Sequence, residues 1–284
     1  MIIDMRLRPP LPTWKATPQF NEGAGYYPTR LGFPRPPSVR SQSIPDLLKE
    51  MDEAGITWGV VMGRQSGPPL GSIPNDEIAS VIQDHPGRFV GFAGIDLRDI
   101  AAGVTEIERT ARLPGFRGVS IEPGASHQPM YSDDRSLYPI YECCQRLGLP
   151  ISISLSGALS AMVGHDLRYG SPTSVSNVAK DFPRLKIVVS HAAWPNVMPM
   201  IEVAFLRENV YISPDLYMNH VDTPGAHEFI KGARLFFADR LLFGTAYPSR
   251  PLKESVLAFR KWDLEPSLAA KIFYSNAAGL LGLQ

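Results

Sequence analysis

The chain opens with Ile2-Ile3-Asp4-Met5-Arg6-Leu7-Arg8, a run with the composition of a β-strand. Side chains alternate along a strand, so Asp4, Arg6 and Arg8 share one face and the apolar residues share the other. We expect the apolar face (Ile3, Met5, Leu7) to pack against outer helices. The charged face is then expected to point into a barrel, where buried arginines need carboxylate partners.

Short β-branched runs alternate with helical patterns along almost all of the 284 residues, which predicts βα units and a parallel sheet. The predicted strands are Ile2–Leu7, Ile56–Met62, Phe89–Ile95, Phe116–Ile121, Ile151–Leu155, Lys186–Ser190, Val210–Ser213 and Arg240–Phe243. The predicted helices are Ile44–Ala54, Asn75–Asp84, Ile100–Arg112, Asp134–Leu147, Pro172–Phe182, Trp194–Leu206, Pro224–Ala233, Leu252–Trp262 and Pro266–Tyr274. Eight such repeats predict a single-domain (β/α)8 TIM barrel over residues 1–284, with its site at the carboxyl ends of the strands. A doubly wound sheet is the alternative, but the sequence contains no G-x-G-x-x-G or P-loop motif that would favour it.

Residues 9–41 interrupt this rhythm with prolines at 9, 10, 12, 18, 28, 34, 36 and 37 and with interleaved aromatic residues. Such a composition makes a regular helix or central strand unfavourable. We predict a lid-like insertion after the first strand, packed over the site or against another copy of the chain.

The balance of charged residues argues against some classes of binding partner. Lys+Arg and Asp+Glu balance at 28 each and the pI is near 7.0, so no global field attracts nucleic acid or a membrane surface. We expect a small carboxylate as substrate, for which the arginines are suited, and a homo-oligomer, for which the Pro-rich segment offers a contact. A cytoplasmic location is expected because no long apolar span or signal-peptide pattern is present. Cys143 and Cys144 are adjacent, a spacing that favours buried helical residues over a disulfide or a zinc site.

The same alternation places further polar residues at the predicted barrel mouth. Glu122 follows the fourth strand, Ser154 lies on the fifth, His191 ends the sixth and Asp215 follows the seventh. Trp194 and Tyr247 lie just beyond the sixth and eighth strands and are candidates to contact a flat substrate.

Several segments of the chain follow one another in the order in which they occur in a known superfamily. The Ile2-Ile3-Asp4 opening, Gly115-Phe116-Arg117-Gly118-Val119, Leu149-Pro150, His191 and Leu242-Phe243-Gly244-Thr245-Ala246-Tyr247-Pro248 resemble the amidohydrolase superfamily. The chain is most similar to its amidohydrolase-related group, which includes pyrone-dicarboxylate lactonase and aminocarboxymuconate-semialdehyde decarboxylase.

The resemblance implies a divalent ion held by His-x-His on the first strand, single histidines on the fifth and sixth strands, and an aspartate on the eighth. The sequence has Arg6 and Arg8, Ser154, His191 and Ala246 there. Because guanidinium stays protonated and has no free lone pair, we predict no metal and no other cofactor. The alternative is one divalent ion such as Zn²⁺ at His191, with help from acidic residues and loop histidines.

We predict that His191 is a general acid or base and that Asp215 or Glu122 orients it or activates water. Arg6 and Arg8 are expected to clamp an anionic oxygen, with Ser154, Trp194 and Tyr247 completing the substrate contacts.

Three functions remain open. The first is metal-independent hydrolysis of a small carboxylate-bearing cyclic ester or amide, as in the lactonase branch. The second is a lyase, a decarboxylase or hydratase of a small unsaturated or aromatic acid. The third is ligand binding without catalysis. A Ser154-His191-Asp215 triad is also conceivable, although the sequence has no G-x-S-x-G motif.

Overall fold

The computed structural model describes residues 1–21 and 34–283. Its sheet contains seven parallel strands in sequence order. They are β1 (Ile2–Leu7), β2 (Ile56–Met62), β3 (Phe89–Gly94), β4 (Phe116–Ile121), β5 (Ile151–Ser154), β6 (Ile187–Ser190) and β7 (Val210–Ser213). The helices are α1 (Pro12–Lys15), α2 (Pro37–Ser41), α3 (Ile44–Ala54), α4 (Asn75–Asp84), α5 (Ile100–Thr110), α6 (Tyr138–Leu147), α7 (Gly157–Met162), α8 (Pro172–Asp181), α9 (Val197–Leu206), α10 (Ala226–Gly232), α11 (Leu252–Phe259), α12 (Pro266–Ala270) and α13 (Asn276–Leu281).

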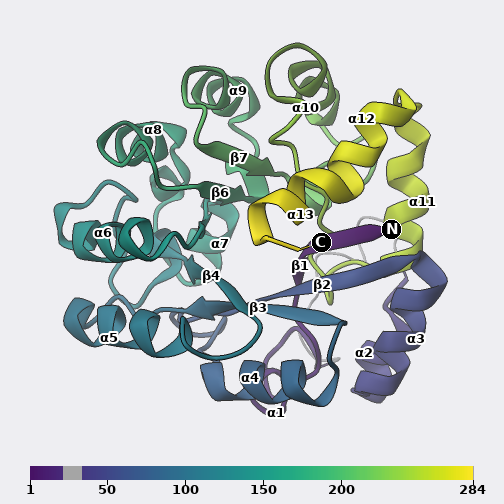
Figure 1. The fold of residues 1–284 in the computed structure, drawn as a ribbon, viewed down its shortest axis with the longest axis horizontal. Coiled ribbons are helices and arrows are strands. Elements are labelled where there is room, and N and C mark those ends of the chain that lie inside the picture. The colour runs from purple at the N-terminus through teal and green to yellow at the C-terminus, as the bar shows by residue number, and fades with distance from the viewer. Residues whose placement is uncertain (22–33, 284) are drawn as a thin grey trace.

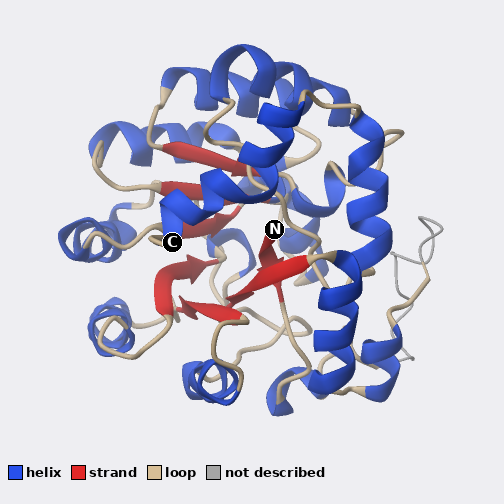
Figure 2. Cartoon of the chain, turned by 45° about the vertical axis from the view of Figure 1, so that its right-hand side comes forward, coloured by secondary structure: helices blue, strands red, loops and turns tan. Residues whose placement is uncertain are grey.

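The sheet curls on itself in the middle of the molecule, and the helices surround it (Figure 1). A turned view shows the same arrangement, with the two ends of the chain near the same end of the barrel (Figure 2). The predicted α/β barrel is therefore confirmed. Within the described residues, no helix has the length and apolar character needed to cross a membrane.

The eighth strand is the main departure from the predicted barrel. The segment Arg240–Phe243 does not form a regular strand. Isolated parallel bridges, Ile212 to Leu241 and Leu7 to Tyr247, join its region to β7 and β1, and the backbone N–H of Met5 donates to the carbonyl of Phe243 at 2.9 Å. Side chains supply other anchors of this closing segment. Asp4 Oδ1 accepts the backbone N–H of Thr245 at 2.9 Å.

A further anchor comes from the C-terminal helix. The side-chain amide of Asn276 donates to the carbonyl oxygens of Ala238 at 2.9 Å and Leu241 at 2.8 Å. These bonds hold the irregular segment in place without a complete ladder.

A core cluster inside the barrel corrects the predicted faces of the first strand. It comprises Ile3, Met5, Val60, Met62, Val90, Phe92, Val188 and Leu242, with residues of α13 packed against it. Side chains from β2, β3 and β6 meet only in the interior, so Ile3 and Met5 point inward and not toward the outer helices as predicted. Leu7 does pack with the helix-facing cluster. The register of β1 is irregular between Asp4 and Leu7, and this irregularity breaks the simple alternation.

The described parts of the Pro-rich insertion contain two short helices, α1 and α2, where we expected no regular helix. Each begins with proline at the first helical position, where the missing N–H leaves no intrahelical bond unmade. Residues 22–33 of the predicted lid lie outside the described residues. Helix α7 has no counterpart among the predicted helices, and Cys143 and Cys144 are buried on α6 as expected.

Candidate active site

The predicted polar residues converge at the carboxyl ends of the strands. Arg6 lies on β1 and Arg8 follows it, Glu122 follows β4, Ser154 ends β5, His191 follows β6 and Asp215 follows β7. Each of these six residues is at most 5% exposed. Buried groups of this kind must find partners within the protein.

Glu122 is the centre of this group. Its Oε1 lies 3.0 Å from Arg8 Nη2 and 3.3 Å from Arg6 Nη2, and its Oε2 lies 2.8 Å from Arg64 Nε. Burial alone would raise the pKa of Glu122, but the charges of Arg64, Arg8 and Arg6 outweigh burial and hold it well below its ordinary value. We call these three arginines around Glu122 the arginine cage.

Two hydroxyl groups complete the coordination of Glu122. Ser66 Oγ donates to Oε2, and Ser154 Oγ donates to Oε1 at 3.1 Å. Ser154 also accepts a hydrogen bond from Arg6 Nη2 at 3.1 Å. An ionised carboxylate so fully engaged is suited to holding the arginines in place, and poorly suited to the predicted activation of water.

The sequence reasoning missed Arg64, which lies two residues beyond the end of β2. The signal was present, because Arg64 continues the face of Val60 and Met62, both in the interior cluster. Its Nη1 is buried and has no hydrogen-bond partner in the described part of the chain. Burial, then the charges of Arg64 and Arg6, lower the pKa of Arg8 well below its ordinary value. An anion bound here would relieve this crowding of positive charge.

His191 and Asp215 form a second buried pair. Asp215 Oδ2 accepts the backbone N–H of His191 at 3.0 Å and lies 3.3 Å from His191 Nδ1. Ser213 Oγ donates to Asp215 Oδ1 at 2.5 Å, and Arg6 Nε lies 3.6 Å from Oδ2. Burial, then the charges of Arg6 and the other cage arginines, hold the pKa of His191 well below 6.5, so its imidazole is neutral at neutral pH.

An unusual backbone positions His191. His191, Ala192 and Ala193 have φ values of 64°, 45° and 55°, three consecutive left-handed residues without a glycine. Each such residue costs on the order of 1–2 kcal/mol, and such strain concentrates at functional sites. The turn also explains why α9 begins at Val197 and not at Trp194 as predicted.

Gly244 allows the closing segment to approach this pair. A Cβ atom at position 244 would lie 2.6 Å from Asp215 Oδ1 and 3.4 Å from Arg6 Cβ. Only glycine fits there without displacing the buried carboxylate.

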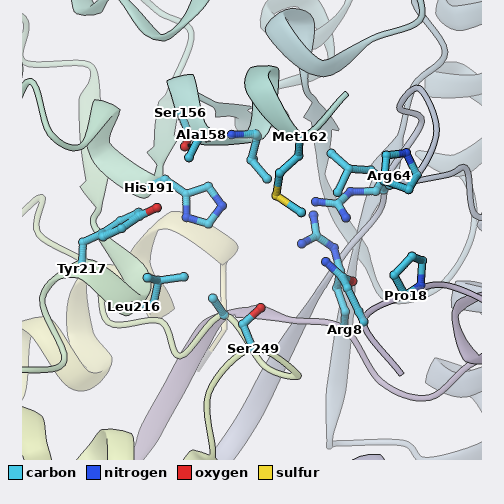
Figure 3. A pocket seen from close by; sticks show the side chains of 15 residues that line it. Arg8, Pro18, Arg64, Ser156, Ala158, Met162, His191, Leu216, Tyr217 and Ser249 are labelled. Carbon is cyan, nitrogen blue, oxygen red and sulfur yellow. Dashed lines mark hydrogen bonds between the residues drawn. The ribbon is translucent and has the colours of Figure 1, made fainter. Parts of the chain in front are cut away.

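A cavity of about 250 Å³ opens between these groups. Its lining residues are Arg8, Pro18, Gln19, Arg64, Pro69, Leu70, Ser156, Ala158, Leu159, Met162, His191, Leu216, Tyr217, Ala246 and Ser249. Arg8 and Arg64 lie on one side of the cavity and His191 lies across from them with Tyr217, while Met162 reaches in between (Figure 3). We call this space the inner cavity.

Four of the predicted substrate contacts lie elsewhere. Arg6 and Ser154 are behind the inner cavity, within the arginine cage. The hydroxyl of Tyr247 lies 2.8 Å from Ser38 Oγ, away from the cavity lining. Trp194 stacks on Tyr217, with ring centroids 4.5 Å apart and planes within 8° of parallel. Tyr217 was not predicted, because it follows Asp215 in a short turn that has no sequence signature.

The donors present do not fit a divalent ion. Across residues 1–21 and 34–283, no group of three His, Cys, Asp or Glu side chains is placed to hold a metal. Glu122 faces three guanidinium groups, whose charge would repel a cation. The alternative of a zinc ion at His191 lacks the three ligands that catalytic zinc sites require.

Residues 31–283 match the sequence profile of the family described as amidohydrolase. The chain belongs to the amidohydrolase family. The structure of this chain is similar to a solved one, that of an uncharacterized TIM-barrel protein from Bordetella bronchiseptica. That protein is 38% identical, with a TM-score of 0.92 over 99% of this chain and 98% of the other.

Two further relatives of this amidohydrolase-family chain have named activities. The γ-resorcylate decarboxylase of Polaromonas is 24% identical over 74% of this chain and 75% of its own length. The 5-carboxyvanillate decarboxylase of Sphingomonas paucimobilis shares the fold, with a TM-score of 0.70, 20% identity and coverage of 100% and 99%. The family match and the likeness to the Polaromonas protein support an enzyme, and the named activities of both proteins are those of decarboxylases and not of hydrolases.

Proposed function

We propose that this amidohydrolase-family enzyme removes CO₂ from a small planar carboxylic acid, without a metal. The observation that carries the proposal is the inner cavity, where two guanidinium groups, Arg8 and Arg64, face the neutral imidazole of His191. The named activities of the relatives favour this lyase reaction over the hydrolysis that we predicted first.

The arginines suit the charge that develops in such a reaction. When the bond to CO₂ breaks, its electron pair passes into the conjugated system and onto an oxygen next to the lost carboxylate. Arg8 and Arg64 would bind that hydroxyl or carbonyl oxygen and stabilise its growing negative charge. Leu159, Met162 and Leu216 supply an apolar wall where a carboxylate is poorly solvated, which favours its departure as neutral CO₂.

His191 supplies the proton that replaces CO₂. Its neutral ring can accept the proton of a hydroxyl group beside the carboxylate and return it to the ring carbon. Cleavage then leaves CO₂ and an oxyanion, which takes a proton from solvent on release. Asp215, 3.3 Å from Nδ1, would stabilise the transient imidazolium.

Hydrolysis remains the second candidate, because a neutral His191 beside Asp215 could equally activate water. A panel of ortho-hydroxybenzoates and carboxylated lactones separates the two reactions. Release of CO₂ from a hydroxybenzoate is the expected result. Ring opening of a lactone with no CO₂ from any acid would overturn the proposal.

Two variants test the roles of the residues. His191→Asn is expected to lower kcat by a factor of about 10² to 10⁴, because the proton transfer is lost. Arg64→Met is expected to lower kcat/KM by about 10² to 10³, because a donor to the oxyanion is removed. Arg98→Met is the control, since Arg98 is exposed and pairs with Asp96. Circular dichroism must show that each variant is folded.

Metal analysis tests the metal-independent part separately. We expect substoichiometric metal in the purified enzyme and full decarboxylation after treatment with a chelator. A stoichiometric ion whose removal abolishes activity, and whose return restores it, would contradict the poor fit of the donor set.

A further inference from the structure

A second cavity of about 600 Å³ adjoins the inner cavity. Ala158, Met162, Leu216 and Tyr217 line both spaces. The two spaces are therefore neighbours across these four side chains, and a substituent of a molecule held at Arg8 and Arg64 would reach this outer cavity by passing Met162 and Tyr217.

The walls of the outer cavity favour a flat, uncharged group. Tyr217 stacks on Trp194, and the indole N–H of Trp194 donates to the carbonyl of Pro224 at 2.8 Å, which fixes the orientation of the pair. Its lining contains one acidic and one basic residue, Asp222 and Arg250, so it carries no excess of charge of one sign. A charged ligand group would gain little there, whereas an aromatic or alkenyl group would remove apolar surface from water.

The volumes of the two cavities also favour a substrate that extends beyond the inner cavity. Ligand sites usually enclose roughly 300–1,000 Å³. The inner cavity, at about 250 Å³, lies below this range, and the outer cavity, at about 600 Å³, lies within it. A single-ring acid would fill the inner cavity and leave the outer one to solvent.

We propose that the outer cavity is a specificity subsite for an uncharged apolar extension of the substrate. The preferred acid then has two parts: a carboxylated head at Arg8 and Arg64, and an aromatic or alkenyl group beside Trp194 and Tyr217. The identity of the head rests on the proposed decarboxylation, whereas the subsite rests on the two adjoining cavities.

Binding of unreactive probes tests the subsite without turnover. The nitro group of 2-nitrophenol resembles a carboxylate in shape and cannot leave as CO₂. We compare the Kd of 2-nitrophenol, by calorimetry, with those of derivatives that carry a phenyl group at each free ring position. At least one phenyl isomer is expected to bind tenfold or more tightly than the parent.

Filling the outer cavity should remove this preference. Thr223→Trp and, independently, His220→Trp place an indole among the residues that line it. Each is expected to reduce the ratio of the two Kd values at least tenfold. Met198→Trp adds the same side chain on an exposed position of α9 that lines neither cavity, and should keep the ratio of the native protein.

The two proposals fail in different ways. If no phenyl isomer binds more tightly than 2-nitrophenol, or if both filled variants keep the preference, the subsite is overturned. If the extended probes bind tightly but no extended or single-ring acid releases CO₂, the subsite stands and the decarboxylation fails.

Discussion

Glu122 is the residue on which the site depends most, because its carboxylate holds the arginine cage together. Glu122→Gln leaves three buried guanidinium groups without their shared counter-charge. We expect this change to lower the free energy of unfolding by roughly 3–5 kcal/mol, the usual effect of breaking a buried pair. Urea denaturation followed by circular dichroism measures it.

The matched control is Glu108→Gln, which removes a partner of Arg146 in an exposed ion pair. Exposed pairs contribute only about 0–1 kcal/mol, so this variant should unfold close to the native protein. If Glu122→Gln behaves like Glu108→Gln, the cage does not stabilise the fold.

Asp4 gives the fold a dependence on pH. Burial raises the pKa of its carboxyl group from 3.8 to about 7, although it accepts hydrogen bonds from Thr245. The folded state therefore keeps this proton after the unfolded state has lost it. Stability from this group is present at low pH and is lost as the pH rises from about 4 to about 7.

Asp4→Asn should remove that dependence, which amounts to roughly 2–4 kcal/mol between these pH values. Denaturant curves at pH 4.5 and pH 7.5 for the native protein and the variant give the difference directly. Asp52→Asn, at an exposed position paired with Arg88, serves as the control. An unchanged pH dependence in Asp4→Asn would show that another group is responsible.

The alternation of side chains predicted that Arg8, Glu122, His191 and Asp215 would share the barrel mouth. It could not show which of them face the cavity, because that depends on distances between strands remote in sequence. Arg6 has the same spacing as Arg8, yet it lies behind the cavity with Glu122. The hydroxyl contacts of Glu122 are likewise set by packing across β2 and β5.

Among the elements, the irregular closing segment was the hardest to predict. Its sequence resembles the other strands, but its ladder is replaced by isolated bridges and side-chain bonds. Asn276→Ala removes two hydrogen bonds to the carbonyl oxygens of Ala238 and Leu241. We expect a loss of about 1–3 kcal/mol in the free energy of unfolding, because the buried carbonyl of Leu241 and the partly buried carbonyl of Ala238 lose their donor.

Asn177→Ala is a suitable comparison, since the Asn177 amide donates to the side chain of Asp133 and not to buried backbone. It should destabilise the protein less than Asn276→Ala. Equal losses would mean that the Asn276 bonds do not brace the closing segment. Hydrogen exchange of residues 240–247 would locate the effect.

The left-handed turn at His191 could not be predicted from its residues. A glycine or asparagine usually marks such a backbone, whereas here two alanines follow the histidine. Hydrogen bonds made by the turn hold it, including those from the backbone N–H groups of His191 to Asp215 and of Ala193 to Leu155.

At the scale of the whole molecule, the repeating strand and helix patterns were sufficient to predict the barrel. That information is spread over eight units, so one irregular strand or a shifted helix boundary does not change the outcome. The activity is harder to predict from the sequence than the fold, because it depends on a few side chains whose chemistry is set by their neighbours.

The burial of the arginine cage determines how the stability of the protein depends on salt concentration. Mobile ions screen charges in solution but reach buried pairs poorly, and Arg6, Arg64 and Glu122 are each at most 2% exposed. The chain as a whole has no net charge to draw an anion from a distance. The stability that the Glu122 ion pairs contribute to the fold should therefore change little from dilute buffer to molar sodium chloride, and there is no long-range attraction of an anionic substrate for the salt to screen.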